Sequence, residues 1–420
     1  MRFLVLPPRG TNVEAELTRK WMVLWEEVVA QGDQTRGSDR FSGKAVEDHL
    51  IPPTVQHSWT ELHQAARNGN LHLVKKLLKQ GAAIESRDEN GWTPLHVASL
   101  NGYAALVRFL LQRGAVIHAG TPSGYTPLHH VAWSGHTHVA EFLLARGALA
   151  TAATRGGLTP LHCAAANGHT LMMQLLLRRG ADVAAVDCNW WTPLHWATAN
   201  NQLHIMDLLI SWPVSPDQGC KGGITPLHIV AELGRVDALL LLLTHGANVN
   251  IQDELGRTPL SSASTNGHQE IVKLLLQRQA DVNLADCHGC TALHKAATAG
   301  HLGIVHLLVK EGGAQVDGRD SLHLTPLHRA SSCGHVEVAS YLLDHGADIN
   351  ATSWLHKTPL HLASEKGHFP LMELLFAKGA DLTLRTQWNE TAQDLGSETS
   401  ATTTTQAIPL SQAPGAFAPS

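Results

Sequence analysis

Histidine is the residue type with the most obvious capacity for chemistry in this sequence, since it accounts for 28 of the 420 residues. Imidazole nitrogens bind zinc and transfer protons near neutral pH. Fifteen of the histidines recur at one of two fixed positions of a 33-residue period. Nine follow a leucine: His63, His96, His129, His162, His195, His228, His294, His328 and His361. Six follow a glycine: His136, His169, His268, His301, His335 and His368.

Regular spacing argues against metal binding by these histidines. All ligands of a zinc ion lie ~2 Å from one centre. Equivalent residues in neighbouring copies of a helical repeat lie about one helix-packing distance apart, ~8–10 Å. We therefore predict that these histidines are part of the fold, and we expect no metal site.

Other motifs of catalysis or cofactor binding are equally sparse. Cys287-His288-Gly289-Cys290 is a Cys-x-x-Cys, but no second such pair completes a zinc site. The six cysteines do not form a spaced disulfide framework, which favours a reducing compartment inside the cell. The sequence has no phosphate-binding glycine loop, no Gly-x-Ser-x-Gly and no paired carboxylates. We therefore predict no catalytic residues and no cofactor.

The histidines belong to a repeated unit. Thr-Pro-Leu-His occurs seven times, with close variants at Thr60, Thr258 and Thr291, and a truncated copy at Thr391. The step is 33 residues except for one of 34. Threonine is a good N-cap, proline fits the first helical position, and the later glycines end helices in the left-handed conformation. Each unit thus predicts two helices, whose apolar faces are buried by the neighbouring units.

This period and motif resemble the ankyrin-repeat family over residues 58–396. The resemblance implies an all-α solenoid of about ten helix-turn-helix repeats with β-hairpin loops, wound into a curved superhelix. It also implies protein partners, held by the hairpin tips and by the exposed side of the first helices. Residues 19–22, 354–361 and 384–388 further resemble one particular member of the family.

The two ends of the chain differ from the repeats. Residues 1–57 are predicted to be an extension with an amphipathic helix at 14–30, followed by a linker. That helix either caps the first repeat or is offered to a partner's groove. Residues 397–420 are rich in Ser, Thr, Ala and Pro and are expected to be disordered. The apolar runs are too short for a signal peptide or for the ~20 residues of a membrane helix.

Large aromatic residues occupy positions that the repeat does not dictate. Such residues are frequent anchors of interfaces, and the alternative is that each packs on its neighbouring tip. The candidates are Trp92, Tyr125, Trp133, Trp190, Trp191, Trp196 and Trp354, with Trp388 in an equivalent slot. The repeat near residue 190 is the most divergent, because Trp190 replaces a hairpin glycine and two prolines follow at 213 and 216. We predict a seam at 212–223 with the main binding site beside it; the alternative is a tolerated degenerate repeat.

Further departures from the pattern fall in the C-terminal half. Ser261 replaces the motif histidine, Gln279 replaces a capping glycine, and His323 and His356 replace hairpin glycines. They predict a locally weaker stack there.

Three asparagines, Asn250, Asn283 and Asn350, follow a leucine eight residues earlier. In ankyrin proteins that this chain resembles, such asparagines are substrates of an asparaginyl hydroxylase. The alternative is that asparagine simply suits the hairpin.

The sequence as a whole favours an intracellular, non-enzymatic scaffold or adaptor, cytoplasmic or nuclear. The formal net charge is −5, which gives no general attraction to nucleic acid or anionic membranes. We expect a monomer with a protein partner. The rival hypotheses are a substrate receptor of a larger enzyme complex such as a ubiquitin ligase, a substrate of an asparaginyl hydroxylase, and an enzyme or metalloprotein.

Overall fold

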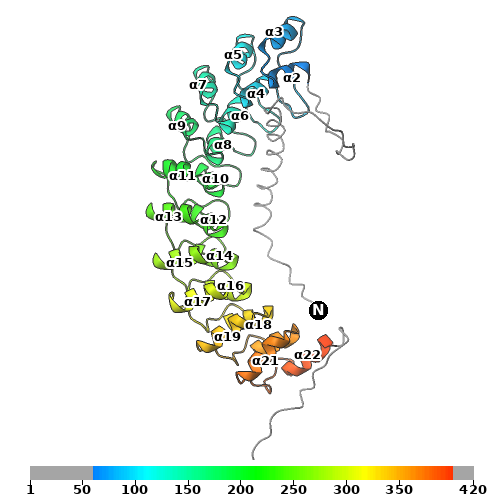
Figure 1. The fold of residues 1–420 in the computed structure, drawn as a ribbon, viewed down its shortest axis with the longest axis vertical. Coiled ribbons are helices and arrows are strands. Elements are labelled where there is room, and N and C mark those ends of the chain that lie inside the picture. Colours follow the sequence, from blue (N-terminus) through cyan, green and yellow to red (C-terminus); the bar gives the residue numbers. More distant parts are fainter. Residues whose placement is uncertain (1–59, 401–420) are drawn as a thin grey trace, which may run out of the picture. The chain divides into compact units, whose positions relative to one another are not determined.

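The computed structural model describes residues 60–400, which lie within one compact unit, His57–Ser420. The predicted helix at 14–30, its linker and the tail from residue 401 lie outside the described residues. Twenty-one helices and no β-strand are present between residues 60 and 400. Twenty of these helices form pairs that follow one another in chain order (Figure 1).

The first helices of the pairs form one row and the second helices form another (Figure 1). The first helices are α2 (Glu61–Arg67), α4 (Pro94–Leu100), α6 (Pro127–Ser134), α8 (Pro160–Ala166), α10 (Pro193–Ala199), α12 (Pro226–Leu233), α14 (Pro259–Asn266), α16 (Ala292–Ala299), α18 (Pro326–Cys333) and α20 (Pro359–Glu365). The second helices are α3 (Leu71–Lys79), α5 (Ala104–Gln112), α7 (Thr137–Ala145), α9 (Thr170–Arg178), α11 (Leu203–Ile210), α13 (Val236–Thr244), α15 (Gln269–Gln277), α17 (Leu302–Lys310), α19 (Val336–Asp344) and α21 (Phe369–Ala377). A last helix, α22 (Ala392–Ser400), runs past the predicted domain boundary at residue 396.

The core lies between and within the pairs, as the apolar spacing predicts. Leu95 on α4 and Val107 and Leu110 on α5 are fully buried. Each first helix packs on the next first helix, and from α5 onward each second helix packs on the next second helix. Small residues such as Ala98, which is also fully buried, let neighbouring first helices approach closely. Burial of one continuous core thus links all the pairs.

The segments between pairs end in tight turns, so the β-hairpin part of the fold prediction is not confirmed. At a typical tip, the Asp88 N–H donates to the carbonyl of Trp92 at 3.0 Å, and the Trp92 N–H donates to the Asp88 carboxylate at 2.7 Å. Neighbouring tips are joined by single backbone bonds, such as that from Cys188 N–H to the Gly156 carbonyl at 2.8 Å. One bond per tip is too few to form a ladder of paired strands.

Most helix ends depend on glycines in the left-handed region, but six other residues adopt positive φ. They are Trp190, Asn201, Gln279, His323, His356 and Asn389. All six occupy positions where the repeat pattern predicts glycine. Each such residue carries ~1–2 kcal/mol of steric cost, which the surrounding stack tolerates.

Helix packing continues across the predicted seam at 212–223. Helix α10 packs on α12, and α11 packs on α13. The tips on either side are also joined, since Lys221 N–H donates to the Asn189 carbonyl at 3.0 Å. The segment is irregular in sequence, but the two rows of helices are not interrupted there.

Candidate functional site

The motif histidines join neighbouring repeats. In α4, the Thr93 N–H donates to His96 Nδ1 at 3.0 Å, so this nitrogen carries no proton. His96 Nε2–H then donates to the carbonyl of Tyr125 in the next repeat at 3.1 Å. The same pair of bonds recurs at His129, His162 and His328. Both ring nitrogens are therefore used by the fold.

Burial keeps these imidazoles neutral. Loss of hydration lowers the pKa of His96, His129, His162, His195 and His328 from 6.5 to about 4. The pKa values of His228 and His294 are lowered for the same main reason. Residues 60–400 contain no group of three or more His, Cys, Asp or Glu side chains that could hold a metal ion. The histidines are thus structural links.

The Cys-x-x-Cys at 287–290 is split by the fold. Cys287 is exposed, whereas Cys290 is buried, and both are free thiols. Burial raises the pKa of the Cys290 thiol, which therefore stays protonated. Its neighbours, Asp320 and Arg329, form an ion pair with Nη2 to Oδ2 at 2.5 Å. This pair anchors a tip to the first helix that follows it.

Most of the predicted aromatic anchors are half-buried and already packed. The Trp92 ring lies 4.3 Å from that of His130, and Tyr125 also contacts His130, with ring centroids 6.0 Å apart. Trp133 packs against the core between α6 and its neighbours. These three residues contribute to stacking, and only part of each surface remains for a partner.

The structure brings together two of the three tryptophans predicted near the seam. The rings of Trp191 and Trp196 meet edge to face at 5.7 Å, and Trp196 Nε1–H donates to the Asp187 carboxylate at 3.1 Å. Trp190 is different, since 57% of its surface is exposed in the positive-φ turn.

Consecutive tips near the C-terminal end expose a set of apolar side chains. We call Leu322, Trp354, Leu355 and Trp388 the C-terminal tip surface; their exposed fractions are 56%, 68%, 40% and 58%. Backbone bonds hold the tips together, from Trp354 N–H to the Leu322 carbonyl at 3.1 Å and from Gln387 N–H to the Leu355 carbonyl at 3.0 Å. Neighbouring exposed apolar residues of this kind mark interaction sites.

Polar groups lie around the C-terminal tip surface. The His323 ring lies 6.2 Å from that of Trp354, and the Lys357 ammonium lies 5.9 Å from the centre of the Trp388 ring. A pocket of about 410 Å³ is lined by Arg319, His323, Thr352, Ser353, Trp354 and His356. Leu322 and Leu355 were not among the predicted anchors, although each is an apolar residue within a polar turn, which is a signal that the sequence does contain.

The three asparagines of the hydroxylation hypothesis link consecutive repeats. The side-chain oxygen of Asn250 accepts from Asp281 N–H at 2.8 Å, and that of Asn350 accepts from Asp381 N–H at 2.9 Å. Asn283 accepts from Gln315 N–H at 3.1 Å. Asp217 makes the same kind of bond to Asn248 N–H at 3.0 Å, so a carboxylate also serves at this position. The position therefore has a structural role of its own.

Comparison with known proteins identifies the family. A family model described as ankyrin repeats (three copies) matches residues 62–154, 150–218, 213–286, 280–353 and 319–386, which is most of the chain. The chain belongs to the ankyrin-repeat family. Members are generally protein–protein interaction modules and are typically not enzymes. No curated protein matches the chain, so the resemblance of three stretches to one particular member is not supported. Within residues 60–400, no helix is long and apolar enough to cross a membrane.

Proposed function

We propose that this protein is a non-enzymatic, intracellular scaffold or adaptor that binds a partner protein through the C-terminal tip surface. The observation that carries the proposal is the exposure of two tryptophans and two leucines on adjoining tips. Tryptophan buries a large area at a small entropic cost and is enriched among residues that dominate binding energy. The surrounding polar groups suit the rim of an interface.

The tryptophans at 190–196 are a second candidate for the same function. Trp190 is exposed enough to anchor a partner, whereas Trp191 and Trp196 already contact each other. A partner at this site would gain less from the latter two, because part of their surface is already removed from water. We therefore rank this site below the C-terminal tip surface.

Affinity capture followed by quantitative mass spectrometry tests the proposal. The baits are the full chain, Trp354→Ala/Trp388→Ala, and Trp191→Ala/Trp196→Ala. Leu149→Ala/Leu171→Ala is the matched control, because these leucines are similarly exposed, at 58% and 70%, and lie elsewhere. All four proteins are first compared by circular dichroism for equal helicity.

A partner lost only from Trp354→Ala/Trp388→Ala supports the C-terminal tip surface. Loss confined to Trp191→Ala/Trp196→Ala moves the site to the 190–196 group. Equal recovery on all four baits contradicts both sites. Light scattering of the purified chain tests the accompanying proposal that it is a monomer.

The substrate-receptor and hydroxylation hypotheses are tested separately. A ubiquitin-ligase receptor requires a recruiting element, and the predicted helix at 14–30 is the candidate; deleting it should remove ligase subunits from the captured set. Hydroxylation of Asn250, Asn283 or Asn350 adds one oxygen, which peptide mass analysis detects. Unmodified peptides at all three positions would end that hypothesis.

A further inference from the structure

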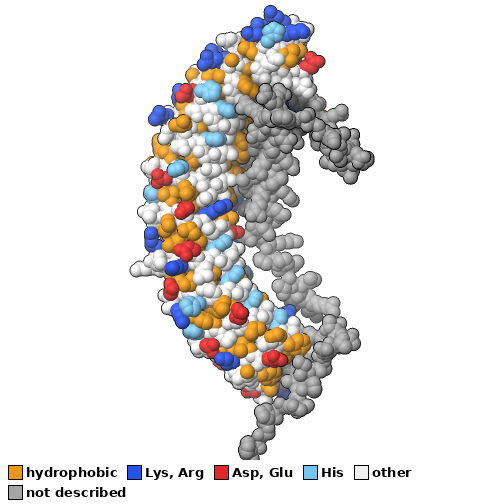
Figure 2. Space-filling model, viewed as in Figure 1, with side chains coloured by type: hydrophobic (Ala, Val, Ile, Leu, Met, Phe, Trp, Pro, Cys, Tyr) orange, Lys and Arg blue, Asp and Glu red, His pale blue; other side chains and the backbone are white. Residues whose placement is uncertain are grey.

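Charge is unevenly distributed along the second helices of the stack. With their C-caps, α3, α5, α7 and α9 carry eight cations and one acidic residue, Glu141. The corresponding helices α11 to α21 carry seven acidic residues and four cations. Lys and Arg side chains accordingly gather at the N-terminal end of the stack (Figure 2).

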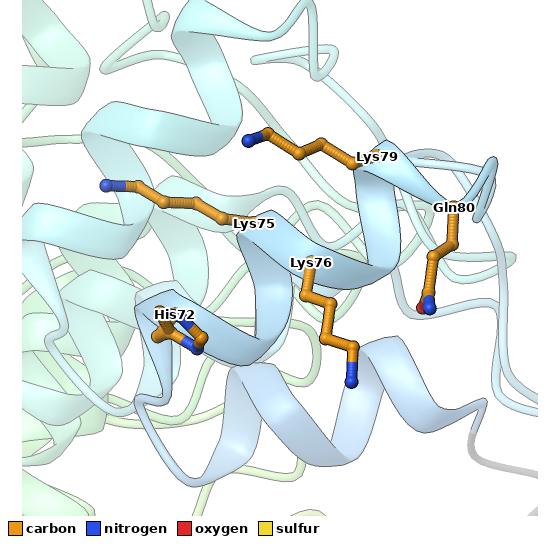
Figure 3. Close-up of a pocket in the computed structure, with 5 residues that line it drawn as sticks. All are labelled: His72, Lys75, Lys76, Lys79 and Gln80. Atoms are coloured by element: carbon orange, nitrogen blue, oxygen red, sulfur yellow. The ribbon is translucent and has the colours of Figure 1, made fainter.

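We call the eight cations the basic surface. Helix α3 contributes Lys75, Lys76 and Lys79. Helices α5, α7 and α9, with their caps, contribute Arg108, Arg113, Arg146, Arg178 and Arg179. On α3, Lys75 and Lys79 extend to one side, while Lys76 and Gln80 extend to another, around a pocket of about 370 Å³ that His72 also lines (Figure 3).

All eight cations are exposed, and none of them is in an ion pair within the described part of the chain. The six ion pairs found between residues 60 and 400 all lie at residues 207–378. Glu141, the one acidic residue on these helices, forms no ion pair with any of the eight cations. The basic surface keeps its charge available to an external anion.

Aromatic rings hold four of these cations in defined positions. Lys75 Nζ and the Arg113 guanidinium lie 5.4 and 5.1 Å from the centre of the Phe109 ring. Arg108 and Arg146 lie 5.2 and 4.9 Å from the centre of the Phe142 ring. Cation–π contacts of this kind restrict long side chains before any ligand binds, which reduces the entropic cost of binding.

Stabilisation of helix C-termini accounts for part of the pattern, because cations there interact favourably with the helix dipole. Arg113, Arg146 and Arg179 are the C-caps of their helices. Lys75 and Arg108, however, lie in the middle of theirs. The dipole does not account for these two cations, which contact aromatic rings and face solvent without an anionic partner.

We propose that the basic surface of α3–α9 binds an acidic, Asp- and Glu-rich segment of a partner protein. Guanidinium groups in fixed positions match carboxylates with paired hydrogen bonds. A membrane is disfavoured because Leu73 and Leu171 are the only large apolar residues exposed on these four helices. A nucleic-acid single strand is disfavoured because no Phe, Tyr or Trp ring on these four helices is exposed for base stacking.

The test measures binding of a fluorescein-labelled peptide of alternating Glu and Gly to the full chain by anisotropy. The variant is Arg108→Glu/Arg113→Glu. The matched control is Lys273→Glu/Arg278→Glu, which changes the charge equally at the same two positions of a later repeat. Because the whole chain has a net charge of −5, general attraction cannot bind this peptide.

We expect salt-sensitive binding that the variant weakens about tenfold or more and the control by less than about twofold. Equal weakening by both variants, or no binding to the unmodified chain, would overturn the proposal. The proposal would also be overturned if anionic lipid vesicles or single-stranded DNA bound more tightly than the peptide and if Arg108→Glu/Arg113→Glu abolished that binding. The tip variants are expected to leave peptide binding unchanged, so this proposal and the proposed function can fail independently.

Discussion

Lowering the pH from 7 to 5 should destabilise the helix stack, because five motif histidines are buried in their neutral form. The pKa of each is 6.5 when unfolded and about 4 when folded. The unfolded chain therefore binds more protons than the folded chain between these values. The stabilising contribution is fully present above pH 6.5 and is lost as the pH falls toward 4.

The magnitude follows from the size of the pKa difference. One pKa unit corresponds to about 1.4 kcal/mol, so each histidine removes roughly 2 kcal/mol from the free energy of unfolding at pH 5. Five such groups together approach the whole stability of a typical domain, ~5–15 kcal/mol. Unfolding should therefore begin well above pH 4, before most carboxylates are protonated.

Urea unfolding followed by far-UV circular dichroism at several pH values measures this effect. His328→Ser is the comparison, because the natural Ser261 shows that a hydroxyl can replace the ring at the cap: Thr258 N–H donates to Ser261 Oγ at 3.0 Å. The variant should be less stable at pH 7. Between pH 7 and pH 5 its free energy of unfolding should fall by roughly 2 kcal/mol less than that of the unmodified chain, because one buried histidine has been removed. A free energy of unfolding that is equal at pH 7 and pH 5 would refute the reasoning.

Three further predictions concern stability, each measured by thermal and urea unfolding. Gln279→Gly and His356→Gly should each stabilise the chain by about 1 kcal/mol, because both residues have positive φ and are exposed; Arg278→Gly, at negative φ, should not. Arg329→Gln should cost ~1–3 kcal/mol, since it removes the cation paired with a buried carboxylate; a neutral result would show that backbone donors alone satisfy that group. Ala98→Leu should cost ~1–3 kcal/mol or more by overpacking adjoining first helices, and unchanged stability would mean that the space is not tight.

The helices and their order were predictable because their signals are local. A threonine cap, a proline at the first helical position and a glycine at the end lie within a few residues of the helix that they define. Ten-fold recurrence of these signals removes the ambiguity of any single copy. The recurring glycine positions also identified the strained residues: Gln279 and His356 replace a glycine of the repeat, and both have positive φ.

The candidate surfaces were decided by tertiary structure, because the exposure of a side chain depends on residues a full repeat away. Trp92 and Trp354 both lie at tips, at different positions of the turn; His130 of the next repeat covers Trp92, while 68% of Trp354 is exposed. From the tip at residues 121–125 onward, each turn likewise makes one backbone bond to the next tip, where the family pattern alone predicted a β-hairpin. Sequence thus determined which elements form and in what order, whereas contacts between repeats determined which side chains remain available to a partner.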